Sequence, residues 1–305
     1  MLRAWLAAST LILVTVTLMP IQMVAVALKS QLRRRIPVIY HRIVCRLLGV
    51  RIFVIGAPPR HQPSLVIANH VSWIDISVIS TVAPTVFVAK REIADWPIFG
   101  LLAKLQQSVF VDRQRRQKTK EVNSEIAERL VGGDPVVLFA EGTSSDGNRV
   151  LPFRSALIGA ARDVVIQAKN TSCILMQPLS IAYVGLHGIP MGRQHRHRAA
   201  WYGSTDLLPH LKKVMREGAI DVVLTWGEPV AFTAESNRKQ VAKTLEAKVR
   251  KLTAAALRTA PQMAGVIKPQ PAGSTNSIVR PLQERLAVPN WRAQRWKEIQ
   301  AFKLF

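Results

Sequence analysis

The sequence predicts an α/β domain that follows an N-terminal apolar helix. Past Val50, short apolar runs of the β type alternate with stretches of helical periodicity, which is typical of α/β domains. The preceding segment, Ala4–Leu28, contains no charged residue. We therefore expect a membrane anchor and a basic amphipathic helix over residues 1–50, a catalytic domain over residues 51–258, and a basic, loosely ordered tail over residues 259–305.

The length of the apolar segment favours a membrane anchor over a cleaved signal peptide. A helix needs about 20 apolar residues to cross the hydrocarbon core, whereas the apolar region of a signal peptide has only about 7–15. Positively charged residues stay on the cytoplasmic side of a membrane. Only Arg3 precedes the segment, and several basic residues follow it: Lys29, Arg33, Arg34 and Arg35. We expect a single N-terminal span, with the rest of the chain on the cytoplasmic side.

The next stretch has the pattern of a basic amphipathic helix. Its apolar side chains fall on one helical face: Ile36, Ile39, Tyr40, Ile43, Val44, Leu47 and Leu48. Arg35, Arg42 and Arg46 lie off that face. Two interpretations remain open, since such a helix lies in the membrane interface or packs on the core of its own domain.

The charge balance indicates a polyanionic partner. The 42 Lys and Arg residues against 19 Asp and Glu give a formal net charge of +23, which suits nucleic acid or an anionic bilayer. The charge-free N-terminal segment favours membrane lipid, so we expect no nucleic acid partner. Cys45 and Cys173 are far apart in the sequence, and His195 and His197 have no neighbouring Cys, Asp or Glu. We therefore expect no metal site.

The alternating pattern past Val50 defines the expected strands and helices. Strands are expected at Arg51–Ile55, Ser64–Ala68, Thr85–Lys90, Gln107–Asp112, Pro135–Ala140, Cys173–Tyr183 and Asp221–Thr225. Helices are expected at Trp73–Val82, Ile98–Leu105, Lys118–Val131, Phe153–Ala168, Asp206–Arg216 and Arg238–Arg258.

A polar turn follows the apolar run Leu65–Ala68 and contains His70, Ser72 and Asp75. Ser72 is a suitable N-cap for the next helix, and Asp75 then falls in the first helical turn. Because His70 precedes the helix, its ring can fold back towards the carboxylate of Asp75. A carboxylate there would fix one imidazole tautomer and leave the other nitrogen as a base. The alternative is an ordinary capped helix start with a polar histidine in a loop.

Two further elements carry candidate binding residues. A turn with Glu141, Gly142 and Thr143 leaves the strand-like run Val136–Leu138, and a Gly-containing turn of this kind exposes backbone N–H groups to a ligand. Arg113 ends another strand-like run and is a reasonable clamp for an anion. Taken alone, the first element is also explained by an ordinary turn.

Together these elements resemble the motifs of the 1-acylglycerol-3-phosphate acyltransferase family of lysolipid acyltransferases. The order and spacing agree from Arg51 to Pro229 for four motifs: N-H-x-x-x-x-D at Asn69, His70 and Asp75; a Gly followed by F-x-x-R at Gly100 and Phe110–Arg113; E-G-T at Glu141–Thr143; and a Pro within an apolar strand at Pro178. One such motif is weak evidence, whereas several in order make a strong case.

The resemblance implies a glycerolipid acyltransferase-like α/β domain, with a mixed sheet flanked by helices. It implies that His70, supported by Asp75, removes the proton from the hydroxyl of a lysolipid acceptor. That hydroxyl then attacks the thioester of an acyl carrier protein or of acyl-CoA. The residues implied to bind substrate are Arg113, Glu141, Gly142 and Thr143. Neither a cofactor nor a metal is implied, and the cell inner membrane is the expected location.

The sequence departs from the family pattern at Ser144, where the third motif, E-G-T-R, has arginine. That arginine is associated in the family with the acceptor phosphate, and serine cannot form a bidentate charged pair. Either Arg113, Arg149 or Arg154 substitutes, or the acceptor carries no phosphomonoester. The run from Glu141 to Arg149 resembles bacterial acyltransferases that act on lyso-ornithine lipid. We therefore expect ornithine lipid as the product, with phosphatidic acid as the alternative.

A serine hydrolase is the rival class among enzymes. Its nucleophile elbow has the pattern G-x-S-x-G, which does not occur in the chain. Its absence counts against a nucleophilic serine on an α/β-hydrolase sheet, and the family resemblance implies no acyl-enzyme.

Overall fold

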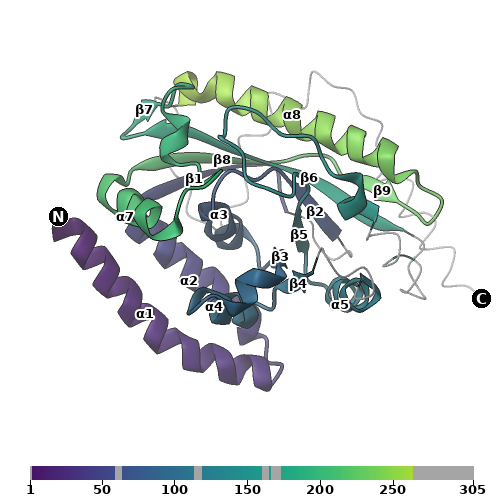
Figure 1. Ribbon diagram of the computed structural model, residues 1–305, viewed down its shortest axis with the longest axis horizontal. Coiled ribbons are helices and arrows are strands. Elements are labelled where there is room, and N and C mark those ends of the chain that lie inside the picture. The colour runs from purple at the N-terminus through teal and green to yellow at the C-terminus, as the bar shows by residue number, and fades with distance from the viewer. Residues whose placement is uncertain (1, 59–63, 113–118, 160–164, 166–172, 264–305) are drawn as a thin grey trace, which may run out of the picture. The chain divides into compact units, whose positions relative to one another are not determined.

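One mixed sheet forms the centre of the described chain. The computed structural model describes residues 2–58, 64–112, 119–159, 165 and 173–263. The strands are β1 (Val50–Ile55), β2 (Ser64–Ala68), β3 (Val86–Lys90), β4 (Val109–Val111), β5 (Val136–Phe139), β6 (Ile174–Leu186), β7 (Ile189–Pro190), β8 (Ile220–Trp226) and β9 (Val230–Phe232). They form a 9-stranded sheet of order β1-β8-β6-β2-β5-β3-β4, and β7 and β9 both pair with β6 (Figure 1).

Parallel pairing brings the carboxyl ends of the central strands to one edge of the sheet. β2 is parallel to β5 and β6, and β5 is parallel to β3. β8 runs antiparallel to β6, so the sheet is mixed, as the sequence predicts. Val66 and Ala68 of β2 join one hydrophobic cluster, and Leu65 and Ile67 join the other. Burial on both faces explains why this strand reads as a continuous apolar run.

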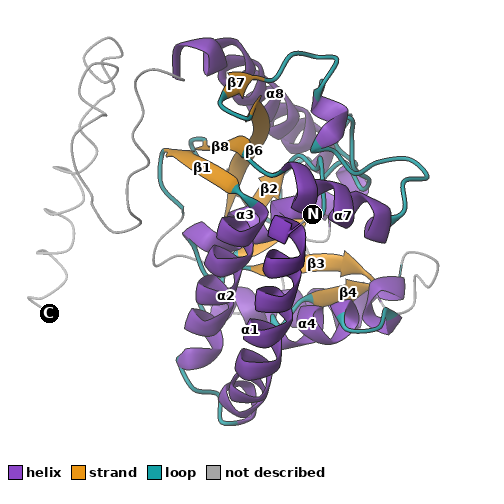
Figure 2. Cartoon of the chain, turned by 90° about the vertical axis from the view of Figure 1, so that its left-hand side faces the viewer, coloured by secondary structure: helices purple, strands orange, loops and turns teal. Residues whose placement is uncertain are grey.

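Helices cover both faces of the sheet (Figures 1 and 2). They are α1 (Leu2–Ala27), α2 (Leu32–Leu48), α3 (Ile74–Val82), the 3-10 helix η1 (Arg91–Asp95), α4 (Phe99–Leu105), α5 (Thr119–Val131), the 3-10 helix η3 (Arg196–Arg198), α7 (Leu207–Glu217) and α8 (Arg238–Met263). Side chains of α2, α3 and α7 share one core cluster, whereas those of α5 and α8 share the other. The two clusters therefore lie on opposite faces.

Most of the expected elements are confirmed, and the differences lie mainly at their ends. β6 extends to Leu186, and α8 continues to Met263, past its expected end. β9 was not expected, because three residues are too few to show a periodic pattern. Of the helix expected at Phe153–Ala168, the structure describes 155–159 as helical. Residues 264–305, which hold most of the expected tail, lie outside the described residues.

The amphipathic helix expected after the apolar segment is α2, and its apolar face packs on its own domain. Ile36, Val44 and Leu48 are buried, and α2 contacts α3. The helix ends at Gly49, whose φ of 73° is the left-handed conformation that favours glycine. Of the two interpretations left open by the sequence, packing on the domain core is confirmed.

The apolar helix α1 packs along the same domain. By length and composition, Arg3–Ala27 could cross a membrane, with a mean hydropathy of 2.1. Near the start of α1, Nη1 of Arg3 lies 3.4 Å from the carbonyl oxygen of Met215 in α7. Near its end, Gln22 donates from Nε2 to the carbonyl oxygen of Leu105 in α4 at 2.9 Å. The domain therefore holds α1 at both ends.

Candidate active site

The candidate site lies where the loops after β2 and β5 meet. These strands are parallel neighbours, so both loops leave the same edge of the sheet. The N–H of Ala140 donates to the carbonyl oxygen of Ala68 at 3.1 Å, and the N–H of Ser145 donates to the carbonyl oxygen of His70 at 2.8 Å. The backbone alone therefore fixes the first motif against the third.

Asn69 ties the start of the first loop to β6. Its side-chain Nδ2 donates to the carbonyl oxygen of Ile181 at 3.0 Å, and the N–H of Ile181 donates to its Oδ1 at 2.8 Å. The amide thus continues the pairing of β2 with β6 for one step beyond the last strand residue. Asn69 is buried, and a buried amide needs such partners. Its role is to hold the neighbouring His70 at the edge of the sheet.

Asp75 is fully buried, with no exposed surface. Its Oδ2 accepts from Nδ1 of His70 at 2.8 Å and from the N–H groups of Val71 and Ser72 at 2.7 and 3.0 Å. Its Oδ1 accepts from the hydroxyl of Tyr183 at 2.7 Å. Burial of a carboxylate is tolerated only with such partners, and here both oxygens have them.

The partners of Asp75 determine which imidazole nitrogen carries the proton. An ionised carboxylate only accepts hydrogen bonds. Nδ1 of His70 must therefore donate to Oδ2, and in the neutral ring this leaves the lone pair on Nε2. The fold-back of His70 onto Asp75 that the sequence predicts is present in the structure.

The His70 ring is held by stacking as well as by its hydrogen bond. It lies on the ring of Phe139, with centroids 4.0 Å apart, and Phe139 in turn stacks with Phe87 of β3 at 6.1 Å. The His70 side chain keeps 18% of its surface exposed. Within the described residues no group hydrogen-bonds to Nε2, so this nitrogen is available to a substrate.

Glu141 lies behind His70 rather than in front of it. Its Oε2 accepts from the N–H of His70 at 3.3 Å, and its Oε1 accepts from the N–H of Leu151 at 3.0 Å. The side chain is buried, and burial raises the pKa of this carboxyl to about 8. Glu141 thus connects the loop after β2 to the loop after β5, a role that the sequence did not predict.

The remaining candidate residues differ in backbone conformation and in exposure. Gly142 has a φ of 72°, a backbone conformation that favours glycine. Thr143 is exposed and Ser144 is half-buried, so both are accessible from the loop surface. Arg113 lies outside the described residues, and its expected role stays a prediction.

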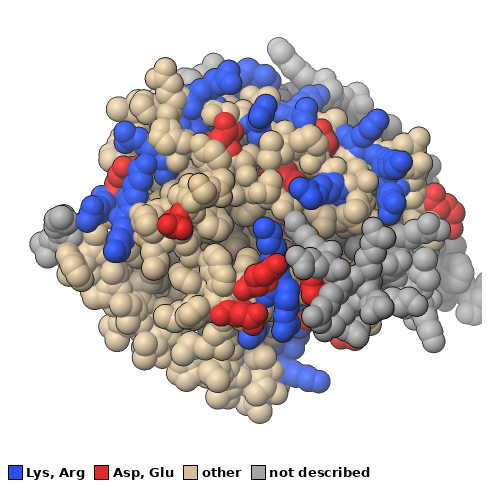
Figure 3. Space-filling model, viewed as in Figure 1, with Lys and Arg blue, Asp and Glu red and all other residues tan. Residues whose placement is uncertain are grey.

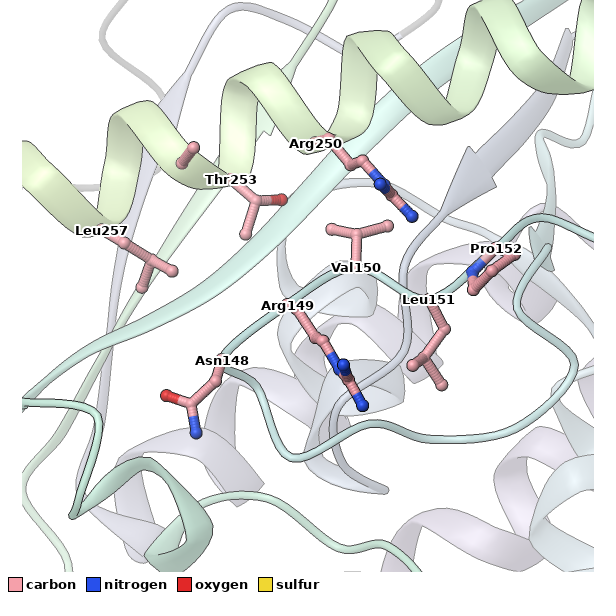
Figure 4. A pocket seen from close by; sticks show the side chains of 9 residues that line it. Asn148, Arg149, Val150, Leu151, Pro152, Arg250, Thr253 and Leu257 are labelled. Atoms are coloured by element: carbon pink, nitrogen blue, oxygen red, sulfur yellow. The ribbon is translucent and has the colours of Figure 1, made fainter.

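Two arginines were candidates to replace the missing cation at Ser144. Arg154 donates from Nε to the carbonyl oxygen of Glu141 at 3.2 Å, so it braces the loop. Arg149 is exposed and, with Arg250 of α8, lines a cavity of about 570 Å³ beside the loop (Figure 4). Arg154 thus braces the loop through Nε, and Arg149 lies at the cavity rather than at the position of the family's arginine.

The structure corrects one expectation and adds one residue. Ser72 is not the N-cap of α3: the helix begins at Ile74 and has no side-chain cap. The N–H of Asp75 donates to the backbone carbonyl oxygen of Ser72 at 3.0 Å, and the carboxylate of Asp75 accepts from the N–H groups of Val71 and Ser72, which precede the helix. Tyr183 was missed by the sequence reasoning. A tyrosine within the otherwise apolar strand Ile181–Val184 could have indicated it, because a buried hydroxyl needs a partner.

Comparison with known protein sequences gives three findings. Residues 51–182 match the Acyltransferase family. A lyso-ornithine lipid O-acyltransferase of Brucella abortus is 48% identical over 256 residues, which cover 84% of this chain and 96% of the relative. A relative of the same description from Rhizobium meliloti is 46% identical over 272 residues, which cover 89% and 93%.

Among solved structures, the crystal structure of the 1-acyl-sn-glycerophosphate acyltransferase from Thermotoga maritima is similar. The TM-score is 0.51 at 24% identity, over 72% of this chain and 77% of that chain. This likeness confirms the fold.

Tyr183→Phe should destabilise the protein by about 1–3 kcal/mol, because it removes the donor to a buried oxygen of Asp75. Denaturant unfolding in detergent measures the loss. The same change at the exposed Tyr202 is the matched control and should have little effect. Equal stability of the two variants would contradict the role given to Tyr183.

Glu141 should make stability depend on pH. A folded-state pKa of about 8 lies above the unfolded value of about 4.3, so folding favours the protonated form. The stabilisation that Glu141 contributes to the folded state is fully present below about pH 4.3 and is lost as pH rises through about 8. The unfolding free energy of the wild type, relative to Glu141→Gln, should therefore fall over this range. Glu228→Gln, at an exposed carboxyl, is the control, and a wild-type curve parallel to Glu141→Gln would refute the assignment.

Proposed function

The chain belongs to the acyltransferase family, within the lysolipid acyltransferases, and from this premise we propose that it acylates lyso-ornithine lipid to give ornithine lipid. The observation that carries the proposed chemistry is the His70–Asp75 pair, which leaves Nε2 of the imidazole free beside an open loop. Two relatives described as lyso-ornithine lipid O-acyltransferases, each similar over most of both chains, support the acceptor.

The proposed reaction is one displacement at a thioester. Nε2 of His70 removes the proton from the acceptor hydroxyl as its oxygen attacks the thioester carbonyl. The ester C–O bond forms, the C–S bond breaks, and the imidazolium returns the proton to the leaving thiolate. Asp75 stabilises the imidazolium through Nδ1. General-base help of this kind is worth about 10²–10⁴ in rate.

The loop after β5 supplies the proposed binding residues. Glu141 positions His70 through its backbone N–H, and Gly142 provides the left-handed turn. Thr143 is exposed and is proposed to contact the acceptor headgroup. Arg113 keeps its proposed role as an anion clamp.

Ser144 supports an acceptor without a phosphomonoester. The neighbouring Arg154 uses its Nε–H on the carbonyl oxygen of Glu141, so this cation braces the loop. An acceptor with another headgroup does not require a bidentate phosphate contact. The proposed donor is acyl carrier protein or coenzyme A, each of which presents the fatty acyl group as a thioester.

The N-terminal helix is compatible with membrane anchoring, and we propose the cell inner membrane with the catalytic domain on the cytoplasmic side. The bias of basic residues after α1 supports this orientation. The single span expected from its length stays a prediction. Contacts of Arg3 with α7 and of Gln22 with α4 favour attachment through the outward face of α1, because both ends are held by one domain.

Membranes that contain the protein should transfer label from acyl carrier protein or acyl-CoA, offered separately, to lyso-ornithine lipid. His70→Ala should lower the rate by about 10²–10⁴, and His195→Ala, at an exposed histidine, should not. The labelled lipid is identified by chromatography. Undiminished transfer in His70→Ala would refute the mechanism, and transfer to lysophosphatidic acid alone would refute the acceptor.

Ser144→Arg should raise transfer to lysophosphatidic acid relative to lyso-ornithine lipid, because it restores a bidentate cation for phosphate. Competition between the two acceptors in one vesicle preparation measures the ratio. Ser144→Ala removes the hydroxyl without adding charge and is the control. An unchanged ratio in Ser144→Arg would show that this position does not select the acceptor.

A further inference from the structure

A group of large apolar side chains lies exposed at the turn between η1 and α4. We call Trp96, Ile98, Phe99 and Leu101 the apolar patch; their exposed fractions are 38, 67, 38 and 39%. Single exposed apolar residues are ordinary, whereas adjoining ones mark a surface that meets a partner or a membrane. The patch takes no part in the site described above.

The backbone holds Ile98 outward in a conformation that isoleucine rarely adopts. Its φ and ψ are 63° and −57°, and the N–H of Phe99 donates to the carbonyl oxygen of Pro97 at 2.6 Å. This is the positive-φ γ-turn, which is rare and strained, above all for a β-branched residue. Strain of this kind persists where the surroundings enforce it, commonly at functional positions.

Gly100 shows how the surroundings enforce the turn. A Cβ on Gly100 would collide with the carbonyl oxygen of Ala94 in η1, so α4 begins in direct contact with the preceding helix. The N–H of Gly100 also donates to the carbonyl oxygen of Trp96 at 2.9 Å. The patch is therefore presented by a rigid turn.

The patch adjoins both the membrane-anchoring helix and the catalytic edge. α4 contacts α1, and Gln22 of α1 donates to the carbonyl oxygen of Leu105 (Figures 1 and 2). η1 directly follows β3, and β3 is parallel to β5. Phe87 of β3 stacks with Phe139, which stacks on His70. The turn thus leaves the same edge of the sheet as the catalytic loop.

The surroundings favour lipid over a protein partner. Charged side chains are sparse over the part of the surface that α1 forms, and blue residues gather over α8 and α7 (Figure 3). The patch itself has a mixed rim: Lys90, Arg91, Glu92, Asp95 and Lys104 are exposed. A standard protein interface uses about 20–30 residues a side. Four side chains fall far short of that number, but they suffice to enter a leaflet beside an existing anchor.

We propose that the apolar patch inserts into the same leaflet as the outward face of α1 and holds the catalytic edge of the sheet against the bilayer. A lysolipid would then reach His70 without leaving the membrane surface. The inference rests on the membrane attachment proposed above, and not on the identity of the acceptor.

An environment-sensitive nitrobenzoxadiazole label tests the insertion directly. The label is placed by Ile98→Cys or by Ile189→Cys, in a Cys173→Ser background. Ile189 of β7 is the matched control, because it is 68% exposed but lies outside the patch. Cys45 is buried, and burial raises the pKa of its thiol to about 12, so it should not react. The labelled full-length protein is bound to phosphatidylglycerol–phosphatidylcholine vesicles that contain doxyl-labelled lipid.

The label at position 98 should shift its emission to the blue and be quenched by doxyl lipid, while the label at position 189 should do neither. A water-like emission at position 98 in vesicle-bound protein would overturn the insertion of the apolar patch but not the membrane attachment through α1. A blue shift without lipid quenching would assign the patch to a protein partner and overturn the proposal. Failure to bind vesicles would overturn the patch and the anchor together. Acyl transfer is assayed separately with soluble donor, so this failure is distinguished from a failure of the proposed function.

Ile98→Gly tests the contribution of the Ile98 side chain while keeping the turn. Glycine adopts positive φ without strain, so the turn should remain while the membrane contact is lost. Binding to the same vesicles should weaken roughly tenfold, since burial of one large apolar side chain has about that effect. Ile189→Gly should leave binding unchanged. Equal binding of both variants would contradict the proposed contact.

Discussion

The buried carboxylate of Asp75 is the constraint on which the rest of the site depends. A carboxylate without exposed surface is tolerated only when its oxygens have hydrogen-bond donors. The His70 ring, the backbone of the turn and the hydroxyl of Tyr183 supply them. Because the ring must donate through Nδ1, the same contacts that stabilise the buried charge leave the lone pair of the neutral ring on Nε2, the atom proposed to act as the base. Stability and chemistry therefore depend on the same bonds.

The sheet topology brings these donors together. β2 lies between β5 and β6, so the loop after it can contact both neighbours at once. Asn69 binds β6, and the N–H of His70 binds Glu141 after β5. Through β3, the same edge continues to the apolar patch beside α1. The proposed catalytic groups and the apolar patch proposed to face the membrane thus share one edge of one sheet, which suits an enzyme whose acceptor is a lipid.

The sequence predicts local features of this fold well and contacts between distant segments poorly. The His70–Asp75 contact is predictable because one turn closes it. Tyr183 was missed because its contact with Asp75 requires the pairing of β2 with β6. Glu141 was expected at the substrate, yet its burial against His70 follows from the pairing of β2 with β5. The N-cap prediction at Ser72 was wrong because α3 begins only at Ile74, and the N–H of Asp75 donates to the backbone carbonyl oxygen of Ser72 at 3.0 Å rather than to its hydroxyl.

The tautomer of His70 is the property that tests this arrangement most directly. Long-range ¹⁵N–¹H correlation spectra of histidine-labelled protein in detergent report which ring nitrogen is protonated, and the His70 signals are those absent from His70→Ala. The neutral ring should carry its proton on Nδ1 in the wild type and lose that preference in Asp75→Asn. A proton on Nε2 in the wild type, or an unchanged tautomer in Asp75→Asn, would contradict the assignment of His70 as a base oriented by Asp75.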